Sequence, residues 1–222
     1  MNYKSDLTDS ENVIDYKLEE NQKKIHTALP CRVLNFYPNN QTVDLEVLVK
    51  KIKSDDTLEN YPPLLNVPIS YPRGGGFCVT YPLNKGDEGQ VIFNERCIDK
   101  WWLSGEPSEP IDFRLHDLSD GCFISGICSQ PKAVKGFFTD GLSLQTLSGD
   151  TFIRIVNGKI LIQGDIEHSG NTNQQGNYSQ VGNYETQGTI SSSGDIKGDS
   201  ISLQGHVHGG VGRGSSNTDR AK

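Results

Sequence analysis

A six-residue glycine repeat in the second half of the chain constrains the fold more than any other feature. Asp, Asn or Thr follows each glycine, and the third position of each unit is an isoleucine, a tyrosine or a threonine. Glycine beside Asp or Asn favours a tight corner, because both residue types tolerate left-handed backbone dihedrals. The segment is therefore predicted to form short extended pieces joined by corners. The repeating glycines are Gly164, Gly170, Gly176, Gly182, Gly188 and Gly194.

The repeat cannot form a hydrophobic core of its own. One sizeable β-forming side chain in each unit buries too little apolar surface to offset the conformational entropy of ordering the chain. Repeats of this kind are stable when they stack on other copies. The sequence therefore predicts an obligate oligomer in which other chains supply the missing core.

Two architectures compete for this segment. A left-handed hexapeptide β-helix coils within a single chain and needs an aliphatic residue in nearly every unit, a pattern that Thr172, Tyr178 and Tyr184 break. In a triple-stranded intertwined β-helix three chains wind round one axis, and one inward side chain per unit is enough. We favour the intertwined form. The alternating residues 140–163 are compatible with a wider base of the same column.

Two histidines, His206 and His208, follow the repeat one valine apart. In an extended strand residues i and i+2 point the same way, so the two imidazoles face one side. Round a threefold axis they supply six nitrogens, an octahedral set. Because zinc prefers four ligands, this set favours iron or nickel, and iron is the more available of the two. We therefore expect a structural iron ion, with zinc or nickel as alternatives. A tail of ordinary polar residues is the other interpretation of the pair.

Charge and hydropathy exclude several classes of protein. The net charge of −7 argues against nucleic-acid binding, because an acidic surface repels phosphate. The N-terminus has no hydrophobic segment of a signal peptide, so we expect synthesis in the cytoplasm. The five cysteines are odd in number and form no CxxC pair, which predicts reduced, mostly buried thiols.

The front of the chain predicts a helix and then a small barrel. Residues 8–26 are expected to be helical, because Thr8 and Glu11 have capping-box spacing and the apolar residues that follow share one narrow face. Short alternating β runs from residue 29 onwards are separated by turn clusters such as PNNQ and NKGDEG. About five strands in this arrangement suit an oligonucleotide/oligosaccharide-binding (OB) barrel.

Two side-chain groups between residues 96 and 131 are candidates for a site. Trp101 and Trp102 are expected to face opposite sides of a strand, one in the core and one in an interface, with a ligand-stacking platform as the alternative. His116, Asp117 and Asp120 suggest a metal site or a catalytic pair, but no nucleophile lies at a recognisable spacing. We therefore interpret HDLSDG as a turn whose side chains bond the backbone.

Four segments carry a family resemblance: HTALPCRVLNFYPNNQTVDLEV, VPISYPRGGGF, KGDEGQVIFNERCIDKWW and FRLHDLSDG. Over about residues 26–131 the chain resembles the N-terminal domain of central spike proteins of contractile-tailed phages. These are the membrane-piercing baseplate spikes related to baseplate assembly protein V. The glycine repeat that ends in HxH and GGV resembles the tip of such a spike.

The resemblance implies a non-enzymatic homotrimer of the virion, with an OB-fold collar, a triple-stranded β-helix shaft and an apex. At the apex, His206 and His208 of three chains hold one iron ion. The collar is implied to bind hub and tail-tube proteins of the baseplate, and sheath contraction to drive the spike through the host outer membrane. We assign the matching signature positions to packing of the trimer and collar: Arg96, Asp99, Trp101, His116 and Asp120.

The expected fold is all-β apart from its first segment. Its parts are a helical segment at residues 1–27, an OB-fold domain at 28–110, a connector at 111–145, the triple-stranded β-helix shaft at 146–204 and the apex at 205–222. Two rival functions stand behind the spike. One is a hexapeptide-repeat acyltransferase with histidine as base, and the other is a tail adhesin for host polysaccharide, motivated by Tyr178, Tyr184 and the polar repeat.

Overall fold

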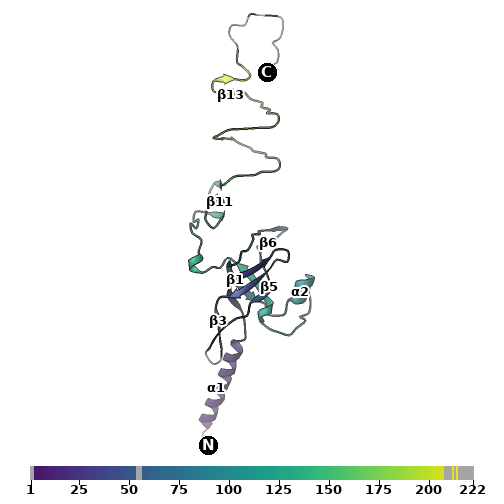
Figure 1. The fold of residues 1–222 in the computed structure, drawn as a ribbon, viewed down its shortest axis with the longest axis vertical. Helices are drawn as coiled ribbons and strands as arrows, with labels where there is room; N and C mark the ends of the chain where they lie inside the picture. The colour runs from purple at the N-terminus through teal and green to yellow at the C-terminus, as the bar shows by residue number, and fades with distance from the viewer. Residues whose placement is uncertain (1–2, 54–56, 208–211, 213, 215–222) are drawn as a thin grey trace. The chain divides into compact units, whose positions relative to one another are not determined.

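The computed structural model describes residues 3–53, 57–207, 212 and 214, and the chain divides into two compact units, Met1–Ile166 and Glu167–Lys222 (Figure 1). The described residues are mostly β, as predicted from the sequence. No helix in this described part combines the length and hydrophobicity that crossing a bilayer requires.

The N-terminal helix α1 (Tyr3–Gln22) confirms the predicted helical segment, although it both begins and ends earlier than residues 8–26. Its apolar residues Ile14 and Leu18 are exposed. Ile25, which was expected on the same face, lies beyond the end of the helix and is also exposed. The helix therefore does not bury its narrow apolar face against its own chain.

Five antiparallel strands form one curled sheet in the order β5-β2-β1-β8-β9. Figure 1 labels two of its strands, β1 and β5. The two edges of the sheet meet just after β5, where Ile69 and Phe123 form a parallel bridge and the Ser70 N–H donates to the Phe123 carbonyl over 2.9 Å. This curled half-barrel is OB-like, as predicted, and we refer to it below as the barrel. Its strands are β1 (Ala28–Tyr37), β2 (Thr42–Val47), β5 (Leu64–Pro68), β8 (Glu88–Phe93) and β9 (Gly121–Ser125).

The core lies inside the curl of this sheet. Its fully buried side chains include Val33, Leu45, Val91 and Phe123, which come from four different strands. Gly89 makes this packing possible, because a Cβ at that position would lie 2.5 Å from the Phe123 ring. The register shift between Val33 and Asn35 is typical of a β-bulge, and such bulges increase the bend of a sheet.

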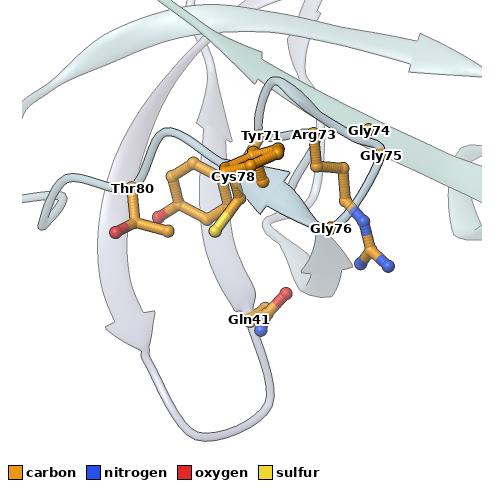
Figure 2. Close-up of a pocket in the computed structure, with 9 residues that line it drawn as sticks. Gln41, Tyr71, Arg73, Gly74, Gly75, Gly76, Cys78 and Thr80 are labelled. Atoms are coloured by element: carbon orange, nitrogen blue, oxygen red, sulfur yellow. The ribbon is translucent and has the colours of Figure 1, made fainter.

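Two short hairpins extend from the barrel: β3 (Lys50–Ile52) with β4 (Leu58–Asn60), and β6 (Arg73–Gly74) with β7 (Phe77–Cys78). The second hairpin turns at Gly75 and Gly76, both at positive φ. A pocket of about 330 Å³ lies between this hairpin, Tyr71 and Gln41. Figure 2 shows the side chains that line it. Phe77 at the hairpin is 83% exposed, so this part of the barrel presents an apolar side chain to its surroundings.

The predicted strand at Trp101 and Trp102 is wrong. Both residues lie in the short helix α2 (Asp99–Ser104), which ends at Gly105 in the left-handed conformation. Its start is fixed from a distance, because the Ile98 N–H donates to Asp120 Oδ1 over 3.1 Å. Trp101 is 51% exposed and Trp102 is 42% exposed, so neither indole belongs to the core.

The expectation of mostly buried thiols holds for only part of the set. Cys31 and Cys97 are buried and Cys122 is half-buried, whereas Cys78 and Cys128 are exposed. All five thiols are free. Burial raises the pKa of the Cys31 thiol to about 11, which keeps that sulfur protonated and unreactive.

The chain also contains two short 3-10 helices, η1 (Leu118–Asp120) directly before β9 and η2 (Gln130–Lys132) after it. After η2, three strands form an antiparallel meander. They are β10 (Leu142–Gln145), β11 (Phe152–Val156) and β12 (Lys159–Gln163). Asn157 and Gly158 make the turn between β11 and β12, with Gly158 at a φ of 75°. The second unit ends in the small hairpin of β13 (Lys197–Gly198) and β14 (Ile201–Ser202).

Candidate functional site

The glycines of the repeat share one unusual backbone conformation. Four of them, Gly164, Gly170, Gly176 and Gly182, have φ values between 120° and 128°, and Gly188 has 153°. Residues with a Cβ rarely adopt this region, so glycine is required at these corners. The prediction that glycine sets the corners is confirmed at five of the six units, and Gly194 lies outside the region.

Side-chain hydrogen bonds repeat with the same six-residue period. Gln174 Nε2 donates to the Asn177 carbonyl over 3.0 Å, and Gln180 Nε2 donates to the Asn183 carbonyl over 2.6 Å. Each of these bonds spans the glycine corner between two units. The repeat is therefore regular in its polar contacts as well as in its backbone.

The apolar residues of the repeat point into solvent. Val181 is fully exposed, and the third-position residues Ile166, Tyr178, Tyr184 and Ile190 are each more than half exposed. Within the described residues 165–195, no backbone N–H donates to another backbone carbonyl and no strand forms. The segment is regular, yet its apolar side chains are exposed and its backbone N–H groups do not bond to backbone carbonyls.

A network centred on Ser202 orders the start of the tip. Ser202 Oγ donates to Asp195 Oδ1 over 2.9 Å and accepts from the Gly205 N–H over 2.7 Å. The Ser202 carbonyl accepts from the His206 N–H over 3.1 Å and lies 2.9 Å from His206 Nδ1. The hairpin β13–β14 thus fixes both the backbone and the ring of His206.

This contact determines which ring nitrogen of His206 is left for a metal ion. A carbonyl oxygen only accepts, so Nδ1 is the donor, and in the neutral ring the lone pair that a metal ion needs is on Nε2. A backbone carbonyl behind the ring is a common way of orienting a metal-binding imidazole. The residue present therefore fits the predicted metal site. His208, the other predicted ligand, lies outside the described residues.

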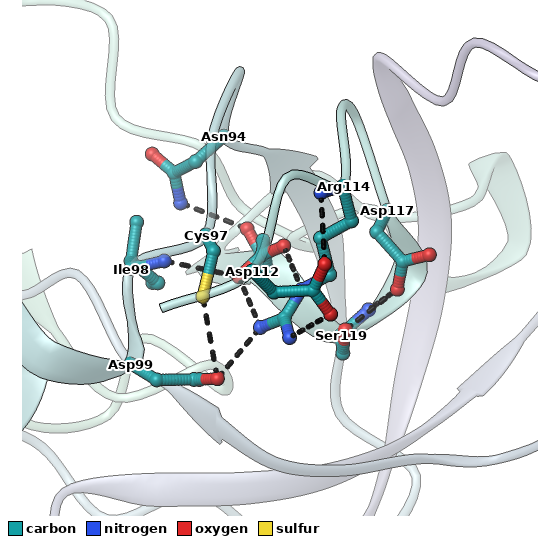
Figure 3. Close-up of polar contacts among 9 residues, drawn as sticks. Asn94, Cys97, Ile98, Asp99, Asp112, Arg114, Asp117 and Ser119 are labelled. Atoms are coloured by element: carbon teal, nitrogen blue, oxygen red, sulfur yellow. Dashed lines mark hydrogen bonds and ion pairs between the residues drawn. The ribbon is translucent and has the colours of Figure 1, made fainter. Parts of the chain in front are cut away.

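A second group of polar residues surrounds Arg114 in the barrel domain (Figure 3). Arg114 Nε donates to Asp120 Oδ2 over 2.6 Å, and its Nη2 donates to Asp99 Oδ2 over 2.7 Å. Asp120 has no exposed side-chain surface, and its Oδ1 also accepts from the Ile98 N–H. Arg114 therefore joins α2, the loop after it and the start of β9.

The electrostatics of this group are those of a structural ion-pair cluster. The Arg114 bond holds the pKa of Asp99 below its usual value, and Asp120 together with Asp99 raises the pKa of Arg114. Cys97, Asp99 and Asp120 form the only set of metal-type ligands in the described residues. The guanidinium already supplies positive charge to both carboxylates of that set.

The structure does not bring His116, Asp117 and Asp120 together as a site. Asp117 accepts from the backbone N–H of Ser119 over 2.9 Å and from its hydroxyl over 2.6 Å. Asp120 is bound to Arg114, and His116 is not part of the metal-type set. The interpretation of HDLSDG as a turn is confirmed.

Of the signature positions, Asp99 and Asp120 serve the Arg114 cluster. The Arg96 side chain forms an exposed pair with Glu95 at 3.4 Å, and its backbone bridges Leu115. Trp101 lies on the exposed surface of α2. Sequence reasoning missed Arg114 altogether. The signal available was a lone arginine in a segment that holds several aspartates, and spacing alone does not show which of them it binds.

Comparison with known protein families finds two matches. Residues 29–126 match the family described as Phage protein Gp138 N-terminal domain, and residues 200–220 match the GpV Apex motif. Comparison with curated proteins gives no match. A Gp138-type domain and a GpV-type apex in one chain define a structural protein of a phage tail.

The chain belongs to the gpV-like baseplate spike proteins of phages, a family of structural proteins of the virion that is generally non-enzymatic. This confirms the resemblance seen in the sequence. The Gp138 match covers the OB-like sheet and the Arg114 cluster. The apex match begins next to β14 and includes His206.

Proposed function

We propose that the chain is the central spike at the tip of a contractile tail, where it pierces the host outer membrane when the sheath contracts. The observation that carries this proposal is the order of the parts. A GpV apex motif ends a segment whose glycine corners repeat one backbone conformation every six residues. A piercing device needs such a stiff column with a closed end, and it needs no catalytic site.

The spike is a homotrimer whose shaft is a triple-stranded intertwined β-helix. Exposed apolar side chains at regular spacing, together with outward backbone groups in residues 165–195, support this assignment. Two further copies of the chain cover the apolar side chains and pair with the backbone groups at the same time. A column whose backbone groups all pair between chains also has no exposed edge, so it can enter lipid without unpaired polar groups.

At the apex, His206 and His208 of the three chains hold one iron ion, with zinc or nickel as the alternative metals. The ion supplies a cross-link between the chains at the end of the column, where fraying begins. The Ser202 carbonyl holds the His206 ring in the tautomer that presents Nε2 as ligand. With imidazoles in every coordination position, the ion is structural.

The OB-like domain is the collar that attaches the spike to hub and tail-tube proteins of the baseplate. Its surface supports an attachment role, because the loop around α2 exposes several large apolar side chains. Leu103 is 87% exposed and Phe113 is 97% exposed. The Arg114 cluster holds this loop against the barrel and so gives the surface a fixed shape.

A second candidate function, binding of host polysaccharide, has one observation in its favour. Tyr178, Gln180, Gly182, Tyr184 and Ile190 line a shallow groove of about 580 Å³ along the repeat. Tyrosine rings beside an amide are groups that sugars stack on and bond to. A glycan-binding assay on the full chain separates this function from that of a metal-closed piercing tip.

The proposal is tested by locating the chain in the particle. Antibodies raised against the purified chain and labelled with gold are expected to decorate contractile particles at the distal tip of the baseplate. Label on side fibres would instead support the adhesin. Label on neither structure would contradict both functions.

A further inference from the structure

The pocket beside the β6–β7 hairpin has a wall that is held in place by the barrel (Figure 2). The Tyr71 ring, which lines the pocket, meets the Tyr81 ring edge-on with 5.4 Å between centroids, and its hydroxyl donates to the Tyr81 carbonyl over 3.1 Å. The Tyr81 hydroxyl lies 2.6 Å from Ser125 Oγ at the end of β9. The volume of about 330 Å³ is at the lower end for ligand sites, so the pocket fits a few side chains of a partner.

Arg73 brings a positive charge to this pocket and has no partner within the described residues. No carboxylate there lies within ion-pair distance of its guanidinium, and the guanidinium donates no hydrogen bond to the described part of the chain. The other arginines of the described part all have partners, which are carboxylates for Arg32, Arg96 and Arg114 and aromatic rings for Arg154. Arg73 is therefore a cation for which the described chain supplies no anion.

The hairpin backbone next to Arg73 is open to close approach. Gly75 and Gly76 need glycine, because their φ values are 57° and 85°. Gly74 does not need it, since its φ lies outside the left-handed region and a Cβ there would meet no atom of the chain within 4 Å. Glycine in a strand weakens the strand, and it commonly marks a place where a ligand or another backbone approaches closely. The bare backbone at Gly74 thus indicates an outside partner.

The groups that line the pocket define the chemistry of that partner. A guanidinium binds a carboxylate through two parallel hydrogen bonds, and the Gln41 amide adds a further donor at the same pocket. Phe77, which also lines the pocket, is 83% exposed and offers an apolar contact. Because the chain carries a net charge of −7, it does not attract small free anions over a distance. A carboxylate that belongs to a protein segment brings additional contacts and suits the pocket better.

We propose that this pocket binds a carboxylate on a peptide segment of another tail protein, with an apolar residue of the same segment packed on Phe77. The proposal rests on the proposed function, because such a neighbour is present only in the assembled particle. Arg73 binds the carboxylate, and Gly74 lets the backbone of the segment come close. A neighbour without the carboxylate would cover Arg73 and leave its charge unpaired, so the pair gives the contact its specificity.

Arg73→Lys converts the pocket into a chemical probe of this contact. The variant keeps the positive charge and adds a primary amine, which a water-soluble carbodiimide joins to a touching carboxylate as an amide, while the carbodiimide takes up the water and becomes a urea. Particles assembled with the variant are treated, digested and analysed by mass spectrometry. We expect an amide between position 73 and a carboxylate of another tail protein. Arg73→Gln, which has no amine there, is the control.

The exposed thiol of Cys78 lines the same pocket and reports whether it is covered. In wild-type particles, alkylation of Cys78 by N-ethylmaleimide is expected to be at least about tenfold slower than in the purified chain. Arg73→Gln and Gly74→Ala are each expected to weaken the contact about tenfold or more, and so to restore most of the alkylation rate or to lose the chain from the particle. Gly74→Ala is expected to melt at the wild-type temperature, because its Cβ meets no atom of its own chain.

The inference is overturned if Cys78 reacts equally fast in particles and in the purified chain, or if both variants keep full protection in particles. It is also overturned if Cys78 is already protected in the purified chain, or if the amide joins position 73 to a second copy, because the occupant is then this chain itself. No amide at position 73 would likewise contradict it. In all these cases the chain is still a component of the particle. Absence of the wild-type chain from contractile particles would contradict the proposed function instead.

Discussion

Arg114 and Asp120 form a two-point ion pair in the barrel domain, with Arg114 Nε 2.6 Å from Asp120 Oδ2 and Arg114 Nη2 2.8 Å from Asp120 Oδ1. The aspartate side chain is completely buried, and Arg114 is only 21% exposed. Such a two-point contact fixes orientation as well as charge. It anchors the loop that carries the exposed apolar residues Leu103 and Phe113 of the OB-like domain.

Loss of the Arg114 guanidinium leaves Asp120 buried without its partner. Arg114→Gln is expected to lower the free energy of unfolding of the barrel domain by about 3–5 kcal/mol. Urea unfolding followed by tryptophan fluorescence measures this, because Trp101 and Trp102 lie on the helix that Asp99 connects to Arg114. Arg96→Gln is the control, since Arg96 forms an exposed pair and its loss should cost less than about 1 kcal/mol. Equal effects of the two changes would contradict the role of the cluster.

The Glu88 carboxylate connects β8 to the segment after β9. It accepts from the Ser129 N–H over 2.6 Å and pairs with Lys132 Nζ at 3.0 Å. The Ser129 bond first, and then Lys132, hold the pKa of Glu88 at about 2 instead of 4.5. A lowered pKa in the folded state means that the contribution to stability is complete above pH 4.5 and is lost as the pH falls towards about 2.

The prediction for Glu88→Gln follows from that sign. The variant is expected to be less stable than wild type near pH 7, with the difference shrinking as the pH falls from 4.5 towards 2. Thermal unfolding across this range measures it. Glu59→Gln, which removes an exposed pair with Lys53 at 3.2 Å, is the control. A difference between Glu88→Gln and wild type that does not change with pH would rule out the carboxylate as its source.

Two glycines of the repeat provide a matched pair for its backbone. Gly176 has a φ of 120°, whereas Gly194 lies outside the left-handed region, and a Cβ at either position meets no atom within 4 Å. Gly176→Ala is therefore expected to cost about 1–3 kcal/mol in each chain through backbone strain alone. Gly194→Ala should be close to neutral. Thermal melting of the two variants tests this, and equal melting temperatures would mean that the corner conformation is not required.

The histidine pair is tested by removing both imidazoles. His206→Ala with His208→Ala is expected to abolish bound metal, as measured by inductively coupled plasma mass spectrometry, while the protein remains a trimer. Ser202→Ala keeps both histidines and the Ser202 carbonyl, so it controls for general disturbance of the hairpin β13–β14. Stoichiometric metal in the double variant would place the ligands elsewhere.

The sequence predicted those parts of the fold that local chemistry determines. The glycine corners and the turn at Asp117 depend on residues within one or two positions, and their conformations follow from residue type. The alternation of Leu142, Leu144, Ile153 and Ile155 likewise indicated extended strands, although not their pairing as an antiparallel meander. What depends on distant partners was missed or wrong. The Ile98 N–H at the start of helix α2 donates to Asp120, and Arg114 joins segments whose spacing has no recognisable pattern.

The Ser202 contact with His206 illustrates the same limit at the tip. The HVH spacing indicated a metal site from residue chemistry alone. The Ser202 carbonyl that contacts the His206 ring is positioned by the hairpin β13–β14, so it could be identified only from the fold. The aliphatic face of the meander was visible in the sequence as alternation. Only the register showed that the aliphatic residues of three strands lie together and that Phe138 covers the other side.

Native mass spectrometry of the purified chain, without added metal, tests the trimer and its metal-closed apex together. We predict a particle of three 24.5 kDa chains that carries the additional mass of one iron ion. A trimer without metal would contradict the apex assignment and leave the shaft in place. A monomer would contradict the spike itself, because residues 165–195 then expose their apolar side chains with no partner to cover them.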